Sequence, residues 1–348
     1  MNQVSVHASG SYEIYVGEGV LSRLSREMKA LPKVKKVCIV SDSHVFPLWG
    51  KQTAGLLKEY EVCSFVFPAG EQSKCGATYL ELLNFLAEHQ LTRTDCLVAL
   101  GGGVVGDLTG FAVATYLRGV AFFQIPTSLL AMVDSSVGGK TAIDLPAGKN
   151  LAGAFYQPKL VLCDLTLLST LPREIFLDGC AEVIKYGILY DAPLFSHLEE
   201  KGPDFDKEKV ITRCVELKRD VVEKDEFDLG LRMKLNLGHT IGHGVEAGSN
   251  FEISHGRGVA IGTAIVTRSA EKLGFCSGET KKRILSVLKK FCLPTETDFN
   301  EEELFIHALS DKKRAGSTVN LIVPREIGLC DIVPTKLQDL TFFIKAGL

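Results

Sequence analysis

Hydrophobic residues between positions 35 and 165 gather in short, nearly continuous runs that are separated by stretches with helical periodicity. The runs are KVCIVSD (36–42), EVCSFVFP (61–68), DCLVALGGG (95–103), VAFFQIPTS (120–128) and KLVLCDL (159–165). Between two of them, the segment ATYLELLNFLAEH (77–89) repeats its apolar side chains with the period of a helix. Continuous apolar runs are typical of strands buried on both faces, as in a parallel sheet covered by helices. We therefore predict an α/β domain built on a parallel, Rossmann-like sheet.

The pattern changes after TLPREIF (170–176), where strand signals nearly vanish. Segments with the periodicity of amphipathic helices continue to about residue 310, and they are followed by one hairpin pattern, TVNLIVPREIGLCDIV (318–333). The boundary falls near residues 169–172. We predict a sheet domain over residues 1–171 and a mainly α-helical domain over residues 172–348. The absence of a long linker or a tandem repeat favours two closely packed halves, as in an enzyme.

The amino-acid composition excludes some classes of protein but does not indicate a function. The 348 residues include 39 Lys and Arg against 42 Asp and Glu, which gives a net charge of −3, and 46% are hydrophobic. This balance excludes fibrous, coiled-coil and disordered proteins. Because no block of Lys and Arg occurs, we expect no nucleic-acid partner.

The chain carries no segment that predicts a membrane or secretion route. Its apolar run at 108–117 is far shorter than the roughly 20 residues of a membrane span. The N-terminus lacks the basic region and apolar core of a signal peptide, which favours a cytoplasmic location. Ten cysteines are scattered without a CxxC pair, so we expect reduced thiols, mostly buried.

A glycine-rich turn follows the run at 95–100 and reads GGGVVGD (101–107). It contains the spacing G-x-G-x-x-G, which lets backbone amides at a helix N-terminus approach a diphosphate. A tight turn without a ligand is the alternative. Because no acidic residue ends the next strand, a standard Rossmann first turn is not expected. Asp42, at the end of an earlier strand, is either a ribose contact or a helix N-cap.

A second glycine-rich stretch reads DSSVGGKTAID (134–144) and is followed by GKN (148–150). Lysines among glycines and hydroxyl residues are typical of phosphate or carboxylate sites, and solvated loop charges are the alternative for both Lys140 and Lys149. The stretch is not a phosphate-binding P-loop, because Asp134 stands where the first glycine of that motif belongs.

Three of the eight histidines fall within 17 positions, at His239, His243 and His255. His239 and His243 are four residues apart, which places them on one face of a helix and about 6 Å apart along its axis. Glu182, in another predicted helix, can add a carboxylate. Two His and one Glu form the ligand set of catalytic zinc sites, although each histidine alone could be a hydrogen-bonded core residue. The residues between the two histidines are not those of a zinc protease.

Further polar residues flank this set. Lys185 follows Glu182 by three positions, and Arg232 and Asn236 precede His239 by seven and three. This spacing predicts that Arg232 and Asn236 share one helix face with the histidines. The face either lines the site or is a solvated surface.

Together these segments resemble the 3-dehydroquinate synthase family of sugar-phosphate cyclases. The resemblance runs in order through GEQSK (70–74), GGGVVGD (101–107), YLRGV (116–120), IPTSLLAMVDSSVGGKTAID (125–144), GKNLAGAFYQP (148–158), EVIKYG (182–187), GLRMKLNLGHTIGHGVE (230–246), HG (255–256) and DKK (311–313). It implies a lyase that uses NAD⁺ and a divalent metal, Zn²⁺ or Co²⁺, acts on a sugar phosphate in the shikimate pathway, and forms a cytoplasmic homodimer.

The resemblance also implies a role for individual residues. The metal ligands are Glu182, His239 and His255. The substrate contacts are Arg118 (toward the neighbouring subunit's substrate), Asp134, Lys140, Lys149, Asn150, Lys185, Lys218, Arg232, Asn236, His243 and Lys312. Of these, the catalytic group comprises Lys140, Lys185, Arg232, Asn236 and His243. The NAD⁺ contacts are Asp42, Glu71, Lys74, Gly102, Gly103, Asp107, Thr127, Ser128, Lys140 and Lys149.

Three positions depart from the family pattern. Arg257 follows His255-Gly256 where the family usually has Glu, Ser128 replaces a Thr, and His44 replaces an Asn near Asp42. Alternatives remain: a cyclase for sedoheptulose 7-phosphate or glucose 6-phosphate, an alcohol or glycerol dehydrogenase of the same fold, and a non-catalytic metal or nucleotide-binding regulator.

Overall fold

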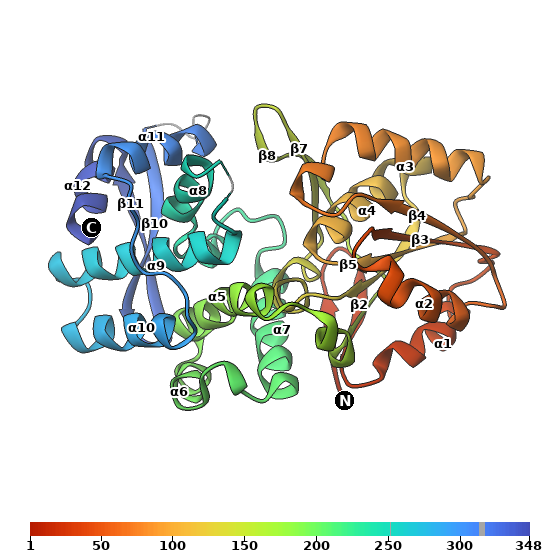
Figure 1. Cartoon of the computed structure of the whole chain (residues 1–348), viewed down its shortest axis with the longest axis horizontal. Coiled ribbons are helices and arrows are strands. Elements are labelled where there is room, and N and C mark those ends of the chain that lie inside the picture. Colours follow the sequence, from red (N-terminus) through yellow and green to blue (C-terminus); the bar gives the residue numbers. More distant parts are fainter. Residues whose placement is uncertain (251, 313–316) are drawn as a thin grey trace. The chain divides into compact units, whose positions relative to one another are not determined.

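The computed structural model describes residues 1–250, 252–312 and 317–348, and the side chains of these residues except 309–312. The chain forms two compact units (Figure 1). The first contains Met1–Pro172 and Lys207–Phe227, and the second contains Arg173–Asp206 and Asp228–Leu348. The predicted combination of a parallel-sheet domain and a mainly helical domain is confirmed.

A seven-stranded sheet organises the first unit, with the order β1-β2-β9-β6-β5-β3-β4. Its strands are β1 (Asn2–His7), β2 (Ser11–Gly17), β3 (Lys36–Asp42), β4 (Glu61–Phe67), β5 (Cys96–Gly101), β6 (Ala121–Pro126) and β9 (Leu160–Asp164). Only the β1–β2 pair is antiparallel; the other neighbours in this sheet run parallel. The five apolar runs of the sequence are therefore five parallel strands, as predicted.

The sheet is covered by helices because its strands are apolar on both faces. One core joins β3 and β5 to α3 (Gly76–Glu88) and α4 (Gly103–Thr115) through buried side chains such as Val40, Leu86, Leu97, Val105 and Leu108. The shorter helices are α1 (Leu24–Lys29) and α2 (Lys51–Leu56). The antiparallel hairpin of β7 (Lys140–Leu145) and β8 (Gly148–Phe155) packs on α4.

The long helix α7 (Lys207–Lys224) belongs to the first unit, although the hydrophobic pattern predicts that all of 172–348 forms the second domain. It packs against β1 and β2. The side chain of Glu208 accepts hydrogen bonds from the amino terminus and from Asn2, and Glu223 accepts one from the backbone of His7. The apolar stripe of an amphipathic helix shows that it must pack, but not which sheet or helix it packs against.

The second unit consists of helices around one hairpin. The helices are α5 (Arg173–Tyr190), α6 (Ala192–Lys201), α8 (His239–Gly248), α9 (His255–Lys272), α10 (Gly278–Lys290), α11 (Glu301–Lys312) and α12 (Leu337–Gly347). The hairpin is β10 (Thr318–Glu326) and β11 (Leu329–Lys336), as predicted. The central helix α9 contacts α5, α8, α10, α12 and β10.

Glycines bring α8 and α9 into close contact. A Cβ atom on Gly262 would lie 2.0 Å from the carbonyl oxygen of Gly238, a distance that no side chain tolerates. Gly238 also has a left-handed backbone, with φ of 78°. The two helices that carry the clustered histidines are thus held at backbone contact.

The described residues contain no helix with the length and apolar character needed to cross a membrane. All ten cysteines are free thiols, and Cys292 is the exposed one.

Candidate active site

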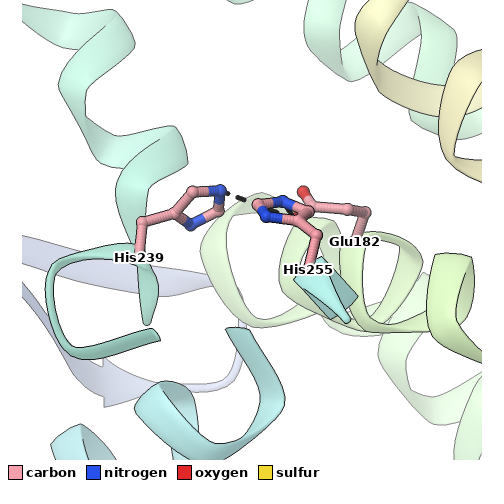
Figure 2. Close-up of side chains that lie close together, drawn as sticks. All are labelled: Glu182, His239 and His255. Atoms are coloured by element: carbon pink, nitrogen blue, oxygen red, sulfur yellow. Dashed lines mark ion pairs between the residues drawn. The ribbon is translucent and has the colours of Figure 1, made fainter. Parts of the chain in front are cut away.

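Three predicted ligand residues come together within the second unit, each from a different helix. Glu182 lies in α5, His239 is the first residue of α8, and His255 is the first residue of α9. Figure 2 shows the two imidazole rings and the carboxylate converging on one point. The Nε2 atoms of His239 and His255 lie 3.6 and 3.4 Å from Glu182 Oε1, and the three candidate ligand atoms all lie within 4.8 Å of one another.

These distances fit a divalent metal ion. Two ligands at about 2.1 Å from a tetrahedral metal are about 3.4 Å apart, which is close to the spacing of the donor atoms here. Glu182 is completely buried, and a buried carboxylate needs positive charge nearby. The donor set of two nitrogens and one oxygen is that of a catalytic zinc-type site with open positions for a substrate or water.

Hydrogen bonds fix the orientation of both imidazoles. His239 Nδ1 lies 3.0 Å from the carbonyl oxygen of Leu237, and His255 Nδ1 lies 3.0 Å from Glu246 Oε1. Because a carbonyl and a carboxylate only accept, each Nδ1 carries the hydrogen. This tautomer leaves Nε2 of both rings facing Glu182, as metal-binding histidines require.

The two histidines differ in their protonation. Burial, together with the positive charge of Lys185, lowers the pKa of His239 to about 3, so this ring is neutral and its Nε2 lone pair is available. Burial also lowers the pKa of His255, but the carboxylates of Glu182 and Glu246 outweigh it and raise this pKa to about 10. Metal binding must therefore displace a proton from His255.

Lys185 contacts the same carboxylate from within α5. Its Nζ atom pairs with Glu182 Oε2, and both side chains are buried. The spacing of three residues places them on one helix face, as predicted. A buried ammonium beside the ligand cluster is suited to holding an anionic group of a substrate.

The prediction of one helix face carrying Arg232, Asn236 and both histidines is wrong. Arg232 and Asn236 lie in a separate 3₁₀ helix, Leu231–Asn236, and α8 begins only at His239. Gly238, with its left-handed backbone, interrupts the helical path between them. Within α8 the spacing of four residues does place His239 and His243 side by side, with ring centroids 5.4 Å apart.

Sequence reasoning missed Glu246, which forms a second cluster with His243 and His255. Its side chain is buried, one helical turn after His243, and it accepts the hydrogen bond from His255. A carboxylate three residues after a candidate histidine is a usable signal, since it shares the face of the helix. It was overlooked because α9, which brings His255 to it, follows a loop whose path the sequence does not predict.

In the first unit, the predicted nucleotide contacts gather at the carboxyl ends of parallel strands. Asp42 ends β3, Gly101 ends β5, and Thr127 follows β6, where its amide donates to the carbonyl of Gly101 at 3.0 Å. The chain order reverses between β3 and β5, because β4 lies on the other side of β3. Such a reversal opens a crevice for ligands in α/β sheets, and here Gly102, which follows β5, is the N-cap of α4.

Asp42 has a clear backbone role at this edge. Its Oδ1 atom accepts from the amides of His44 and Val45, at 2.8 and 2.9 Å. These bonds hold the turn before the short helix Phe46–Gly50, whose N-cap is Val45 and which has no side-chain cap, so the N-cap alternative is not confirmed. A ribose contact through the other carboxylate oxygen stays a prediction.

A buried lysine ties three carboxylates together next to this edge. Lys74 Nζ lies 3.0 Å from Glu71, 3.2 Å from Asp107 and 3.9 Å from Asp144. Burial raises the pKa of Asp107 to about 6, and the charge of Lys74 limits the rise. The predicted contacts Glu71, Lys74 and Asp107 thus form one cluster.

The structure also places the predicted anion contacts. Asp134 Oδ1 accepts from the buried Lys218 Nζ at 2.7 Å, although the two residues are far apart in sequence. Lys140 and Lys149 lie on the two strands of the β7–β8 hairpin, and Asn150 in β8 has φ of 56°. The side chain of Lys312 lies outside the described residues.

Nearly the whole chain is similar to known proteins of one family. Residues 64–178 match the family model of the 3-dehydroquinate synthase N-terminal domain, and residues 179–314 match that of the C-terminal domain. A 3-dehydroquinate synthase of Clostridium acetobutylicum is 43% identical over 343 residues, which cover 96% of each chain.

Two solved structures share the fold. A 2-deoxy-scyllo-inosose synthase complexed with carbaglucose-6-phosphate, NAD⁺ and Co²⁺ has a TM-score of 0.89 at 23% identity and covers all of both chains. A 2-epi-5-epi-valiolone synthase from Streptomyces hygroscopicus, with NAD⁺ and Zn²⁺ bound, has a TM-score of 0.87 at 26% identity and covers 98% of this chain and 97% of its own.

Proposed function

The chain belongs to the 3-dehydroquinate synthase family, and from this premise we propose that it converts 3-deoxy-D-arabino-heptulosonate 7-phosphate into 3-dehydroquinate and phosphate. The reaction makes it a phosphorus–oxygen lyase of the shikimate pathway, which leads to the aromatic amino acids. The observation that carries the proposal is the convergence of Glu182, His239 and His255 in a chain of which 96% aligns with a member of this family.

Sequence identity favours this activity over those of the other sugar-phosphate cyclases. The chain is 43% identical to a 3-dehydroquinate synthase but 23% and 26% identical to inosose and valiolone synthases of the same fold. The segment DSSVGGKTAID (134–144), which contains Lys140, agrees with a substrate that carries a carboxylate.

We assign the cofactor sites from chemistry and geometry. NAD⁺ is proposed to bind at the strand edge formed by Asp42, Gly102, Gly103, Thr127 and Ser128, with the cluster of Glu71, Lys74 and Asp107. Gly102, the N-cap of α4, and Gly103, its first residue, carry no side chains, so a diphosphate could approach their backbone amides closely. Zn²⁺ or Co²⁺ is proposed to bind Glu182, His239 and His255, a borderline ligand set that suits both ions.

When bound, NAD⁺ accepts a hydride from the C5 alcohol and returns it within the turnover, and the metal lowers the pKa of that alcohol. The remaining work is done by side chains that bind and orient the substrate. We propose that its charged and hydroxyl groups are held by the substrate contacts that the family resemblance implies: Lys185, Arg232, Asn236, His243, Asp134, Lys140, Lys149, Asn150 and Lys218. Oxidation acidifies the neighbouring C–H, so that phosphate leaves, and reduction, ring opening and aldol closure follow. Cationic donors fixed around the two anionic groups lower the entropic cost of each step.

Arg118 supports a further proposal, a cytoplasmic homodimer in which this residue reaches the neighbouring subunit's substrate. Leu117, Arg118 and Gly119 have φ values of 50°, 65° and 123°, three consecutive residues in the left-handed region. Strained backbone of this kind persists where the surroundings hold a functional side chain in place.

The experiment that tests the function is phosphate release from three substrates, each with NAD⁺ and Zn²⁺. We expect rapid release from the heptulosonate 7-phosphate, and little from sedoheptulose 7-phosphate or glucose 6-phosphate, which lack the carboxylate. A preference for either of those two sugars would assign the chain to another cyclase activity.

A further inference from the structure

Asp178 lies on α5 four residues before Glu182 and therefore on the same helix face, about 6 Å along the axis. Its carboxylate contacts the first turn of α9, the helix that begins with His255. One face of α5 thus carries a metal-ligand candidate and a carboxylate that contacts the helix of another ligand candidate.

The contacts of Asp178 are those of a helix cap supplied from outside the helix. Its two oxygens accept from the amides of Gly256 and Arg257, at 3.1 and 2.9 Å, and from the hydroxyl of Ser254. These amides are the second and third of the helix, which an N-cap side chain usually satisfies. Ser254 occupies the N-cap position of α9 but makes no cap hydrogen bond of its own. Asp178 therefore takes over that role and ties α9 to α5.

Gly256 makes the approach possible. A Cβ atom at this position would lie 1.9 Å from the carbonyl oxygen of Asp178 and 2.8 Å from its Cγ. Any side chain at position 256 would push the start of α9 away from α5. The close approach and the three hydrogen bonds thus act on the residues that flank His255 on both sides, Ser254, Gly256 and Arg257.

We propose that Asp178 is a positioning residue of the metal centre, which holds His255 Nε2 in place against Glu182 by capping α9 from α5. Glu246 fixes the rotation of the His255 ring through Nδ1. Asp178 fixes the backbone from which that ring extends. The inference rests on the metal assignment in the proposed function, and it concerns a residue outside the ligand set.

This cap from α5 also explains why Arg257 is compatible with the start of α9. Its amide is held by Asp178 and its side chain is exposed. The negative charge at the start of α9 comes from α5, where it also complements the helix dipole. A carboxylate at position 257 is not needed for that purpose.

The test measures metal affinity in Asp178→Ala and Asp178→Asn, using Zn²⁺ in competition with a chromophoric chelator and Co²⁺ by its visible spectrum. We expect Asp178→Ala to weaken Zn²⁺ binding about 10–100-fold, the range for residues that orient metal ligands, and to alter the Co²⁺ bands. Asp178→Asn keeps one acceptor oxygen and should lie between. Glu174→Gln, an exposed acid one turn earlier on α5, is the matched control and should bind as the unmodified protein does.

The outcomes separate a positioning role from a merely structural one. The proposal would be overturned if the metal-free Asp178 variants lose thermal stability but keep a Zn²⁺ affinity within about twofold of the unmodified protein and an unchanged Co²⁺ spectrum. Residues that orient metal ligands normally contribute more than this to metal affinity. If Asp178→Ala does not fold, Asp178→Asn decides by the same criterion. If the unmodified protein binds neither ion, the metal assignment falls and the positioning role falls with it.

Discussion

The side chain of Glu246 offers a direct test of how the metal centre is built. It is 2% exposed and accepts a hydrogen bond of 3.0 Å from His255 Nδ1. Glu246→Gln keeps the shape and one acceptor oxygen but removes the charge. Glu246→Ala removes the acceptor and leaves the Nδ1–H group without this partner.

The size of the effect follows from these contacts. Partners that orient a metal-bound histidine contribute about 10–100-fold to metal affinity, which is about 1.4–2.7 kcal/mol. Because Gln still accepts from Nδ1, we expect Glu246→Gln near the lower end, about tenfold weaker for Zn²⁺. Because Ala leaves the ring unanchored, we expect Glu246→Ala near the upper end, about 100-fold weaker.

The assay is chelator competition for Zn²⁺ on purified protein, with thermal unfolding of the metal-free form as the fold check. Glu252→Gln, an exposed acid in the segment before α9, is the control and should leave affinity unchanged. Equal Zn²⁺ affinity in the unmodified protein and in both Glu246 variants would refute the role assigned to this hydrogen bond.

Three further predictions address stability and substrate binding. The carboxylate of Asp95 accepts hydrogen bonds from the amides of Lys35, Lys36 and Thr92 and from the Thr92 hydroxyl. In Asp95→Asn an NH₂ group replaces one acceptor oxygen, so the free energy of unfolding measured with urea should fall by about 3 kcal/mol at neutral pH. Burial alone would raise the pKa of Asp95, but these hydrogen bonds lower it. The difference in unfolding free energy between the two proteins should therefore shrink as pH falls below about 4, and a difference that stays constant with pH would contradict this role of the ionised carboxylate. Lys218→Met should raise KM for the heptulosonate about tenfold or more and change that for NAD⁺ little, because it removes a charged donor; an unchanged KM in steady-state assays would remove Lys218 from the substrate site. Gly262→Ala should cost about 1–3 kcal/mol in thermal or urea unfolding because its Cβ meets the backbone of α8, and unaltered stability would show that the helices separate easily.

Much of the first unit could be predicted because its strands are buried on both faces. A run such as CLVAL in β5 contains no polar residue, so it differs clearly from the amphipathic helical segments around it. The hairpins β1–β2 and β7–β8 were not predicted as strands, although β1 (NQVSVH) and β2 (SYEIYVG) alternate polar and apolar residues as half-buried strands do. The placement of α7 with the sheet was missed, because amphipathicity identifies a buried stripe and not its partner.

In the candidate site, the sequence predicts which side chains lie together only for residues that are close together in the chain. The spacing of Glu182 and Lys185, and that of His239 and His243, translate directly into shared helix faces. The extension of that logic to Arg232 failed at Gly238, where the helix is interrupted. Asp178 depends on contact between α5 and α9, a tertiary arrangement that spacing does not encode.

The central claim is an internal redox cycle, and one measurement tests it most directly. Phosphate release from the heptulosonate 7-phosphate is followed with NAD⁺ in amounts well below the substrate, while NADH is recorded by absorbance, with and without EDTA. The account predicts many phosphates released per NAD⁺, no accumulation of NADH, and loss of release with the chelator. Accumulation of NADH in step with substrate consumption would show a dehydrogenase, and release that persists after complete removal of metal would contradict the assignment of Glu182, His239 and His255.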